Sequence, residues 1–191
     1  NNFAIGLNAL EANTIGQANM AVGNGALSRN IDGGYNMAFG YNTMPLNEGG
    51  SYNIALGYNS ANQIVNGSYN TVIGTGGSYI NNGNGNISIG NSQAGTDTAS
   101  LDNIIAIGHG ITIDSTTPAT DNTIILGNST ATGPKVGVGI YIPQAKLDVN
   151  GDIRVGGTTA SCSTANEGAI RYESSLKKFQ GCDGSNWVSL H

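Results

Sequence analysis

The stretch Asn36-Met37-Ala38-Phe39-Gly40 contains the pattern that decides the fold. Its last four residues read hydrophobic, small, hydrophobic, glycine, and this motif occurs eight times with small variations. From one closing glycine to the next, the sequence intervals are 17, 17, 17, 17, 16, 18 and 19. Such regular recurrence predicts a stacked repeat fold. The eight motifs close at Gly6, Gly23, Gly40, Gly57, Gly74, Gly90, Gly108 and Gly127.

A second glycine series and an asparagine series share this period. The second glycines recur at the same interval of 17, and an asparagine stands before most motifs, displaced by one position at Asn103 and Asn122. Because asparagine amides bond readily to nearby backbone, we expect ladders that satisfy backbone groups at the corners. The second glycines are Gly16, Gly33, Gly50 and Gly67, and the regular asparagines are Asn2, Asn19, Asn36, Asn53, Asn70 and Asn86.

A repeat of this length is too short for two helices and a turn, but it fits one coil of a solenoid. In a strand, the two bulky motif residues lie on one face and the small residue on the other. We expect the bulky face to point into the coil, and glycine to form the corners because it adopts positive φ at little cost. The prediction is an all-β fold: a parallel β-solenoid, or β-roll, of eight coils over residues 1–132.

The composition excludes several classes of protein. The 191 residues include 30 glycines and 26 asparagines, which cannot form long helices. Charged residues are only 10%, with a net charge of -5, so nucleic-acid binding is disfavoured. No apolar run approaches the roughly 20 residues of a membrane-spanning helix, and we expect no membrane insertion in this segment. Since the chain begins in the middle of a repeat and without Met, we expect it to be part of a longer protein.

One coil with two or three apolar side chains encloses little volume, so partner chains are expected to complete the core. Repeats such as Asn2-Phe3-Ala4-Ile5-Gly6 resemble the head repeats of trimeric autotransporter adhesins, which also occur in phage tail fibres. The stretch from Lys146 to Val155 resembles the connector before the distal modules of such fibres. The resemblance implies a left-handed β-roll in a homotrimer.

The same resemblance implies a function. It indicates a non-enzymatic structural and receptor-binding segment of a trimeric extracellular fibre, either a phage tail fibre of the virion or an adhesin on the bacterial cell surface. The partners expected are two further copies of the chain and a cell-surface glycan or protein receptor. The alternative is a carbohydrate-active enzyme, such as a tail-spike-like depolymerase or a β-helix transferase. Such an enzyme needs converging carboxylates, and the acidic residues share no position across coils.

The composition changes near Gly133-Pro134, because six of the seven basic residues follow it. We expect connector strands over 133–157, at 135–140 and 146–155, and a small antiparallel β-meander over 158–191. Three short strands are predicted within 169–172, 177–180 and 186–190, separated by turns. Ile170, Phe179 and Trp187 are its expected core.

The two cysteines, Cys162 and Cys182, both fall in the predicted meander. They allow one intrachain disulfide, which would stabilise a thin core and indicates an oxidising, extracellular setting. Two separate reduced thiols are the alternative. Their spacing does not fit a metal site, and no metal or cofactor is expected.

No catalytic residue is predicted. A histidine such as His109 could serve as a general base, but none of Asp97, Asp102, Asp114 or Asp121 can be placed near it, and an exposed corner residue is the simpler interpretation. No nucleophile elbow, phosphate loop or zinc spacing occurs in the sequence. The sequons at Asn66, Asn86 and Asn128 matter only in a host that glycosylates its proteins.

Five tyrosines are the candidate ligand-binding residues. They form two rows with the same interval of 17, so their rings are expected on successive coils. Such rows could stack on sugar rings, or they could be structural ladders in which each ring stabilises the next. The sequence leaves both interpretations open. The rows are Tyr35, Tyr52 and Tyr69, and Tyr41 and Tyr58.

Overall fold

The computed structural model describes residues 1–76, 82–90, 101–111, 122–127, 135–140, 142–157 and 160–190. The chain forms two compact units, Asn1–Lys135 and Val136–His191. The described elements are thirteen short strands and one turn of 3-10 helix, so the fold is all-β.

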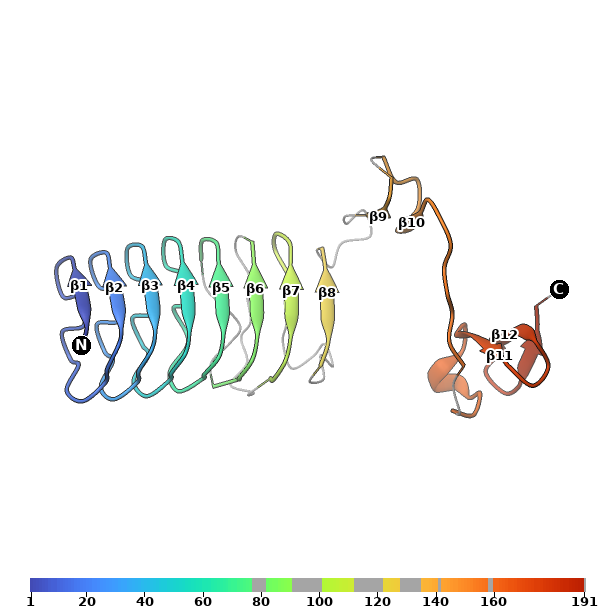
Figure 1. Ribbon diagram of the computed structural model, residues 1–191, viewed down its shortest axis with the longest axis horizontal. Helices are drawn as coiled ribbons and strands as arrows, with labels where there is room; N and C mark the ends of the chain where they lie inside the picture. Colours follow the sequence, from blue (N-terminus) through green and yellow to red (C-terminus); the bar gives the residue numbers. More distant parts are fainter. Residues whose placement is uncertain are drawn as a thin grey trace. The chain divides into compact units, whose positions relative to one another are not determined.

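Each copy of the motif forms one strand of three residues, and the eight strands stack side by side in chain order (Figure 1). All are parallel, and each motif residue pairs with its counterpart in the next copy. The first unit is therefore a parallel β-solenoid in which one coil corresponds to one sequence repeat. The strands are β1 (Phe3–Ile5), β2 (Met20–Val22), β3 (Met37–Phe39), β4 (Ile54–Leu56), β5 (Thr71–Ile73), β6 (Ile87–Ile89), β7 (Ile105–Ile107) and β8 (Ile124–Leu126).

The expectation that the bulky motif residues point into the coil is wrong. In β3, the small residue Ala38 is fully buried and Met37 is exposed, and β4 repeats the arrangement with Ala55 inside and Ile54 and Leu56 outside. The same alternation holds in β2 and in β5 to β7, where the middle residue is the buried one. The solenoid thus buries its small residues and displays its large ones.

The asparagine ladder explains this orientation. The side chain of Asn36 lies inside the coil, where Nδ2 donates to the carbonyl oxygen of Gly50 at 2.7 Å and Oδ1 accepts from the backbone N–H of Asn53 at 2.9 Å. Since alternate strand residues point to the same side, an inward Asn36 forces Ala38 inward and Met37 outward. The predicted amide ladder is confirmed, with the same two kinds of bond along the regular row from Asn2 to Asn86.

The last two motif copies depart from the predicted asparagine ladder. Ile104, not Asn103, occupies the inward position after Asn86: it is fully buried, and its N–H donates to Asn86 Oδ1 at 2.8 Å. Asn103 and Asn122 have positive φ and fall in the row of Tyr35. Because asparagine tolerates the left-handed region better than most residues, this outer row accepts it readily.

Glycine is required where the coils turn after each strand. Gly40 has a φ of +133°, and a Cβ there would overlap the carbonyl of Gly57 in the next coil. An L side chain is therefore excluded by conformation and by space. The prediction that the motif glycines form corners with positive φ is confirmed.

Further from the strand, side chains of successive coils fill the interior. A second amide row runs from Asn13 through Asn30 to Asn47, where each Nδ2 bonds to the preceding Oδ1. Apolar residues, among them Met44 and Ile64, are fully buried beside it. The core is hence a mixture of amide ladders and small apolar clusters.

The second unit contains two small sheets. β9 (Val136–Val138) and β10 (Leu147–Val149) form a parallel pair, so the second connector strand is shorter than the expected 146–155. β11 (Ile170–Glu173), β12 (Lys178–Cys182) and β13 (Trp187–Ser189) form the antiparallel meander. A 3-10 turn at Thr164–Asn166 precedes it.

The disulfide between Cys162 and Cys182 is present, with the Cα atoms 5.4 Å apart. The expected core of this module is wrong in its composition. Trp187 lies on one face of the sheet with Cys182, whereas Ile170 and Phe179 lie on the other face and are exposed. The disulfide and the 3-10 segment lie on the Cys182 face, whereas in the described part of the chain Ile170 and Phe179 on the opposite face stay exposed.

Candidate functional site

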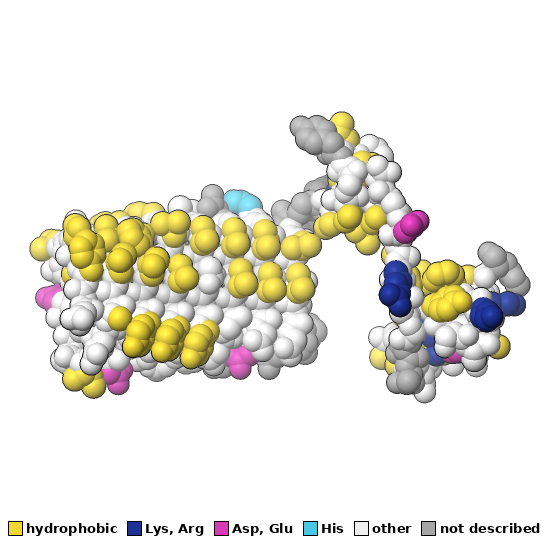
Figure 2. All heavy atoms as spheres, viewed as in Figure 1, with side chains coloured by type: hydrophobic (Ala, Val, Ile, Leu, Met, Phe, Trp, Pro, Cys, Tyr) yellow, Lys and Arg dark blue, Asp and Glu magenta, His cyan; other side chains and the backbone are white. Residues whose placement is uncertain are grey.

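The most distinctive surface of the solenoid is the outside of its eight-stranded sheet. Two rows of side chains run along it, and Figure 2 shows them as two apolar bands, one of which is interrupted near its middle. Thr71 is the only polar residue among sixteen positions. We call this surface the outer apolar face. Its rows are Phe3, Met20, Met37, Ile54, Thr71, Ile87, Ile105 and Ile124, and Ile5, Val22, Phe39, Leu56, Ile73, Ile89, Ile107 and Leu126.

A groove separates the two rows because the middle residue of each strand points inward. Around β4 it is lined by Met37, Phe39, Ile54, Leu56 and Ile73. The cross-section of the face is thus ridge, groove, ridge. Since strands in a sheet are about 4.8 Å apart, the ridges repeat with that spacing.

The outer apolar face is too large for an ordinary monomer surface. Nine of its large side chains are exposed, Ile54 by 43% and Leu56 by 49%. A large apolar side chain carries roughly 150–250 Å² of surface, so the face exposes on the order of 1,000 Å². Contiguous apolar patches on soluble monomers rarely exceed a few hundred Å². An apolar patch of this size is typical of interaction surfaces.

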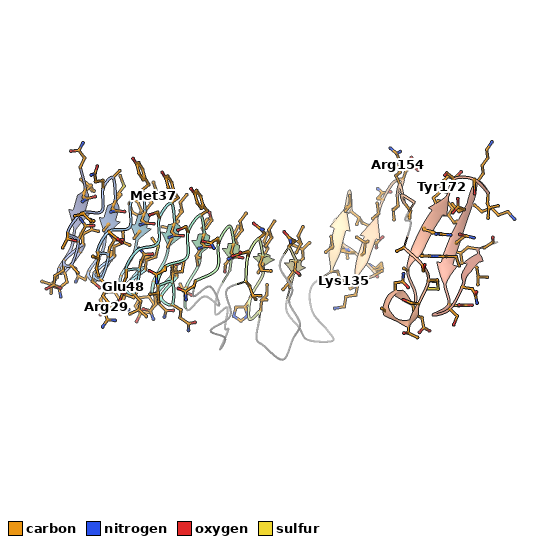
Figure 3. All side chains as sticks on the ribbon, turned by 90° about the horizontal axis from the view of Figure 1, so that it is seen from below. Arg29, Met37, Glu48, Lys135, Arg154 and Tyr172 are labelled. Carbon is orange, nitrogen blue, oxygen red and sulfur yellow. A yellow bond between two sulfur atoms is a disulfide. The ribbon has the colours of Figure 1, made fainter. Side chains whose placement is uncertain are left out.

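The charged residues near β3 lie on another side of the coil. Figure 3 shows Met37 projecting from one side of the solenoid and Arg29 and Glu48 from the opposite side. No charged residue belongs to the outer apolar face. This segregation gives the solenoid one side suited to burial and one suited to water.

The tyrosine rows flank the outer apolar face in sequence: Tyr35 comes two residues before Met37, and Tyr41 two residues after Phe39. Tyr35, Tyr52 and Tyr69 form a stack with centroids 4.8 and 4.9 Å apart and planes within 2° of parallel. Tyr41 and Tyr58 stack at 5.5 Å. All five side chains are exposed.

Stacking decides which parts of the rings a ligand could reach. The faces of Tyr52 are covered by Tyr35 and Tyr69, so its edge and hydroxyl are what it offers to solvent. A sugar ring that stacks on an aromatic face would find such faces only at the ends of the row. The three residues also have φ of 59–60°, a conformation that costs roughly 1–2 kcal/mol for a residue other than glycine. The ring stack helps to offset that cost, and the assignment of the five tyrosines as ligand-binding residues stays a prediction.

The residues weighed for catalysis are not brought together in the described part of the chain. His109 is exposed beside the corner glycine of β7. Asp102 Oδ1 accepts from the backbone N–H of Asn84 at 2.6 Å, a structural contact between coils. Asp97, Asp114 and Asp121 lie outside the described residues, as does the sequon at Asn128. Among the residues that the structure describes, no group of three metal-ligating side chains could hold an ion.

In the C-terminal module, a polar cluster covers the Trp187 face of the sheet. The Arg171 guanidinium lies 4.3 Å from the centre of the Trp187 ring, its Nε donates to Gln180 Oε1 at 2.9 Å, and it pairs with Glu173 at 3.3 Å. Hydrogen bonds from the Ser175 hydroxyl and N–H, together with the Arg171 charge, lower the pKa of Glu173. These contacts order the sheet and offer no open reactive group.

A second carboxylate orders the turn before β13. Asp183 accepts hydrogen bonds from the backbone N–H groups of Asn186, at 2.7 Å, and Ser185, at 2.9 Å. These bonds lower the pKa of Asp183 because they favour its charged form. The carboxylate is thus a structural part of the turn.

Sequence reasoning missed the outer apolar face because it assigned the bulky residues to the interior. The signal that could have found the face is the asparagine row itself. An asparagine that bonds to corner backbone groups lies inside the coil, and the residue two positions later, Ala38 after Asn36, then lies inside with it. Large residues at the intervening positions are left outside.

No protein-family model matches the chain, and no significant match was found among curated proteins or solved structures. In the described ranges, no helix has the length and apolar character to cross a membrane.

Proposed function

We propose that this chain is a non-enzymatic structural segment of a homotrimeric extracellular fibre, a phage tail fibre or a bacterial surface adhesin, that holds or presents a receptor-binding surface. The observation that carries the proposal is the outer apolar face, which runs along all eight strands. Its area, on the order of 1,000 Å², is comparable with the roughly 800 Å² that each partner buries in a typical stable complex.

A second copy of the chain is the partner that best fits this face. The ridges repeat at the spacing of the stacked strands. A partner surface fits them along their whole length only if it repeats at the same spacing. Around a rotation axis parallel to the solenoid, each strand meets its own counterpart, for example β4 beside β4, and no charge is buried. The number of three copies and the left-handed coil follow from the resemblance to adhesin head repeats.

The proposal is tested by placing a charge on the face. Ile54→Asp adds a carboxylate where the monomer already exposes the side chain, so the coil itself is expected to tolerate it. Buried in an oligomer, the charge would be without a partner, and multi-angle light scattering is expected to show the trimer dissociating.

Ile31→Asp is the matched control. Ile31 is similarly exposed, at 45% against 43% for Ile54, and its row already contains a carboxylate, Glu48. This variant is expected to remain trimeric. A wild-type chain that is monomeric at micromolar concentration would contradict the proposal, and so would equal effects of the two substitutions.

The receptor-binding part of the proposal concerns a cell-surface glycan or protein, with the tyrosine rows as the candidate contacts. A glycan array probed with labelled trimer tests it, with Tyr52→Ser compared with Leu176→Ser, at an exposed turn position of the C-terminal module. Loss of binding in the first variant alone is expected. Unchanged binding in both would remove the tyrosine rows from the receptor site.

The enzymatic alternative is distinguished by turnover. The described acidic residues of the solenoid, Glu11, Asp32, Glu48 and Asp102, occupy different positions of the coil. Incubation with host surface polysaccharide is expected to release no oligosaccharide. Repeated release by catalytic amounts of the protein would establish an enzyme in place of a passive fibre.

The disulfide favours an extracellular location, because such bonds persist in oxidising compartments. This agrees with the proposed fibre at a virion or cell surface.

A further inference from the structure

The C-terminal module has an apolar sheet face of its own. Across β11, β12 and β13, the pairing places Ile170 beside Gly181 and Val188, and Tyr172 beside Phe179, with Leu190 next to Phe179. These side chains share one side of the sheet because they alternate with Arg171, Gln180 and Cys182 on the other side. We call this surface the module face. It consists of Ile170, Tyr172, Phe179, Val188 and Leu190.

The two sides of this sheet differ sharply in burial. On the disulfide side, Gln180 and Cys182 are buried. On the module face, Ile170, Phe179, Val188 and Leu190 are all exposed, Ile170 by 57%. A three-stranded sheet needs an apolar face that packs against something to be stable. The module face is apolar and, among the residues that the structure describes, stays largely uncovered, so it is available to a partner outside the module.

A hollow adjoins the module face. It lies between the extended segment 152–157 and the sheet, and its lining includes Ile153, Val155, Tyr172 and Phe179. Arg154 also lines it and stands beside Tyr172 in Figure 3. The hollow extends the apolar surface beyond the edge strand and offers space for a side chain of a partner.

We infer that the module face is a second interface between copies of this chain, in which the sheets of neighbouring copies pack their apolar sides together. The inference rests on the proposed homotrimer, which supplies the partner. It is separate from the outer apolar face, because it concerns another unit and other residues.

The module face is too small to hold two separate molecules together, so its partner is expected to be a copy that the solenoids already hold nearby. With four of its five side chains about half exposed, it offers roughly 400 Å², about half of what a partner buries in a typical stable complex. Alone, such a face supports only weak association. When the solenoids hold the chains together, the modules meet at an effective concentration that can reach the millimolar range, and a small apolar contact then suffices.

Charge does not oppose the contact. The segment 135–191 carries six basic and five acidic residues, whereas residues 1–134 carry one basic and seven acidic residues. Copies of the module are thus nearly neutral toward each other, and the module face itself contains no charged residue. The adjoining hollow contributes one charge of each sign, from Asp152 and Arg154, and so favours neither an acidic nor a basic partner.

The test uses a photoreactive residue in the full-length chain. Val188→p-benzoylphenylalanine places the probe on the module face, and Lys178→p-benzoylphenylalanine places it on the other side of the sheet, also at an exposed position. After irradiation at a concentration where light scattering shows a trimer, gel electrophoresis under denaturing conditions is expected to show covalently joined chains for position 188 and background for position 178.

The outcomes separate this inference from the proposed function. A trimeric chain in which position 188 joins only to its own chain overturns the inference and leaves the solenoid trimer intact. Equal joining at 178 and 188 also overturns it, since the contact would then not belong to one face. A monomeric chain overturns both proposals, and light scattering reveals it before irradiation.

Discussion

The solenoid and the C-terminal module solve the same problem, a thin core, by different means. The solenoid repeats one set of amide and backbone bonds in successive coils, as between Asn36, Gly50 and Asn53. The module has no repeat and joins Cys162 to Cys182 by a covalent bond. Both leave large apolar side chains outside. A short-stranded fold can thus fix its backbone with only a small apolar core, and can leave large apolar side chains on its surface.

The largest expected effect is a break in coil stacking. Gly40→Ala combines a disfavoured positive φ with overlap on the Gly57 carbonyl, and we expect a loss of roughly 3–5 kcal/mol of local stability. Hydrogen exchange of the Met37 and Ile54 amides, which bond to the next coil, measures it. Gly25→Ala is the control, since Gly25 has positive φ but its Cβ would approach only Asn42, with Oδ1 nearest at 3.2 Å and no backbone atom closer than 3.7 Å. Similar losses in both variants would show that conformation, not stacking, sets the need for glycine.

Reduction of the disulfide is expected to destabilise the C-terminal module and to leave the solenoid unchanged. Opening a loop of 20 residues costs the module about 3 kcal/mol, while the solenoid, which contains no cysteine, keeps its stability. Limited proteolysis with and without reductant is expected to show new cleavage only beyond about residue 158. The double variant Cys162→Ser/Cys182→Ser without reductant is expected to give the same fragments. Cleavage within the solenoid after reduction would show that the units depend on one another.

Removing one amide from the asparagine ladder is expected to have the next largest effect on stability. Asn36→Ala removes the acceptor of the buried Asn53 N–H, at a cost of roughly 2–3 kcal/mol, while the Gly50 carbonyl keeps its bond from Asn47. Chemical denaturation followed by circular dichroism measures the change. Gln17→Ala, which removes an exposed amide, is expected to stay within about 0.5 kcal/mol of wild type. If the two variants were equally stable, the ladder would not be what holds the coils.

The smallest change in stability is expected when the second amide row, Asn13, Asn30 and Asn47, is extended by one asparagine. Asn47 Oδ1 is buried without a partner, because the next residue in its row is Ile64. Ile64→Asn would supply a donor while losing apolar burial, so we expect stability within about 1 kcal/mol of wild type. Val72→Asn buries an amide in a row without asparagine and is expected to cost roughly 2–4 kcal/mol. Denaturation midpoints distinguish the two, and an equally large loss in both would mean that Asn47 gains nothing from a ladder partner.

The repeat pattern and the cysteine count were enough to predict the positions of the eight strands, the corner glycines, the asparagine ladder as far as Asn86 and the disulfide partners. Each depends on contacts between residues at one repeat interval or on a single possible pairing, so the pattern contains the information. The period of 17 places Gly40 over Gly57 whatever the shape of the coil. Likewise, two cysteines allow only one intrachain bond.

The repeat pattern could not predict which face of each strand lies inside the coil. A strand divides its residues into two faces, but the alternation does not say which face is buried. The interior of the coil is narrow and already contains amides, so Ala38 fits there and Met37 does not. The same kind of choice placed Ile104 inside in the row of Asn86, covered the faces of Tyr52, and left Ile170 and Phe179 exposed. These outcomes depend on the space available inside the coil and on contacts with residues about one coil away in the sequence or on the other side of a sheet. A local sequence pattern contains neither.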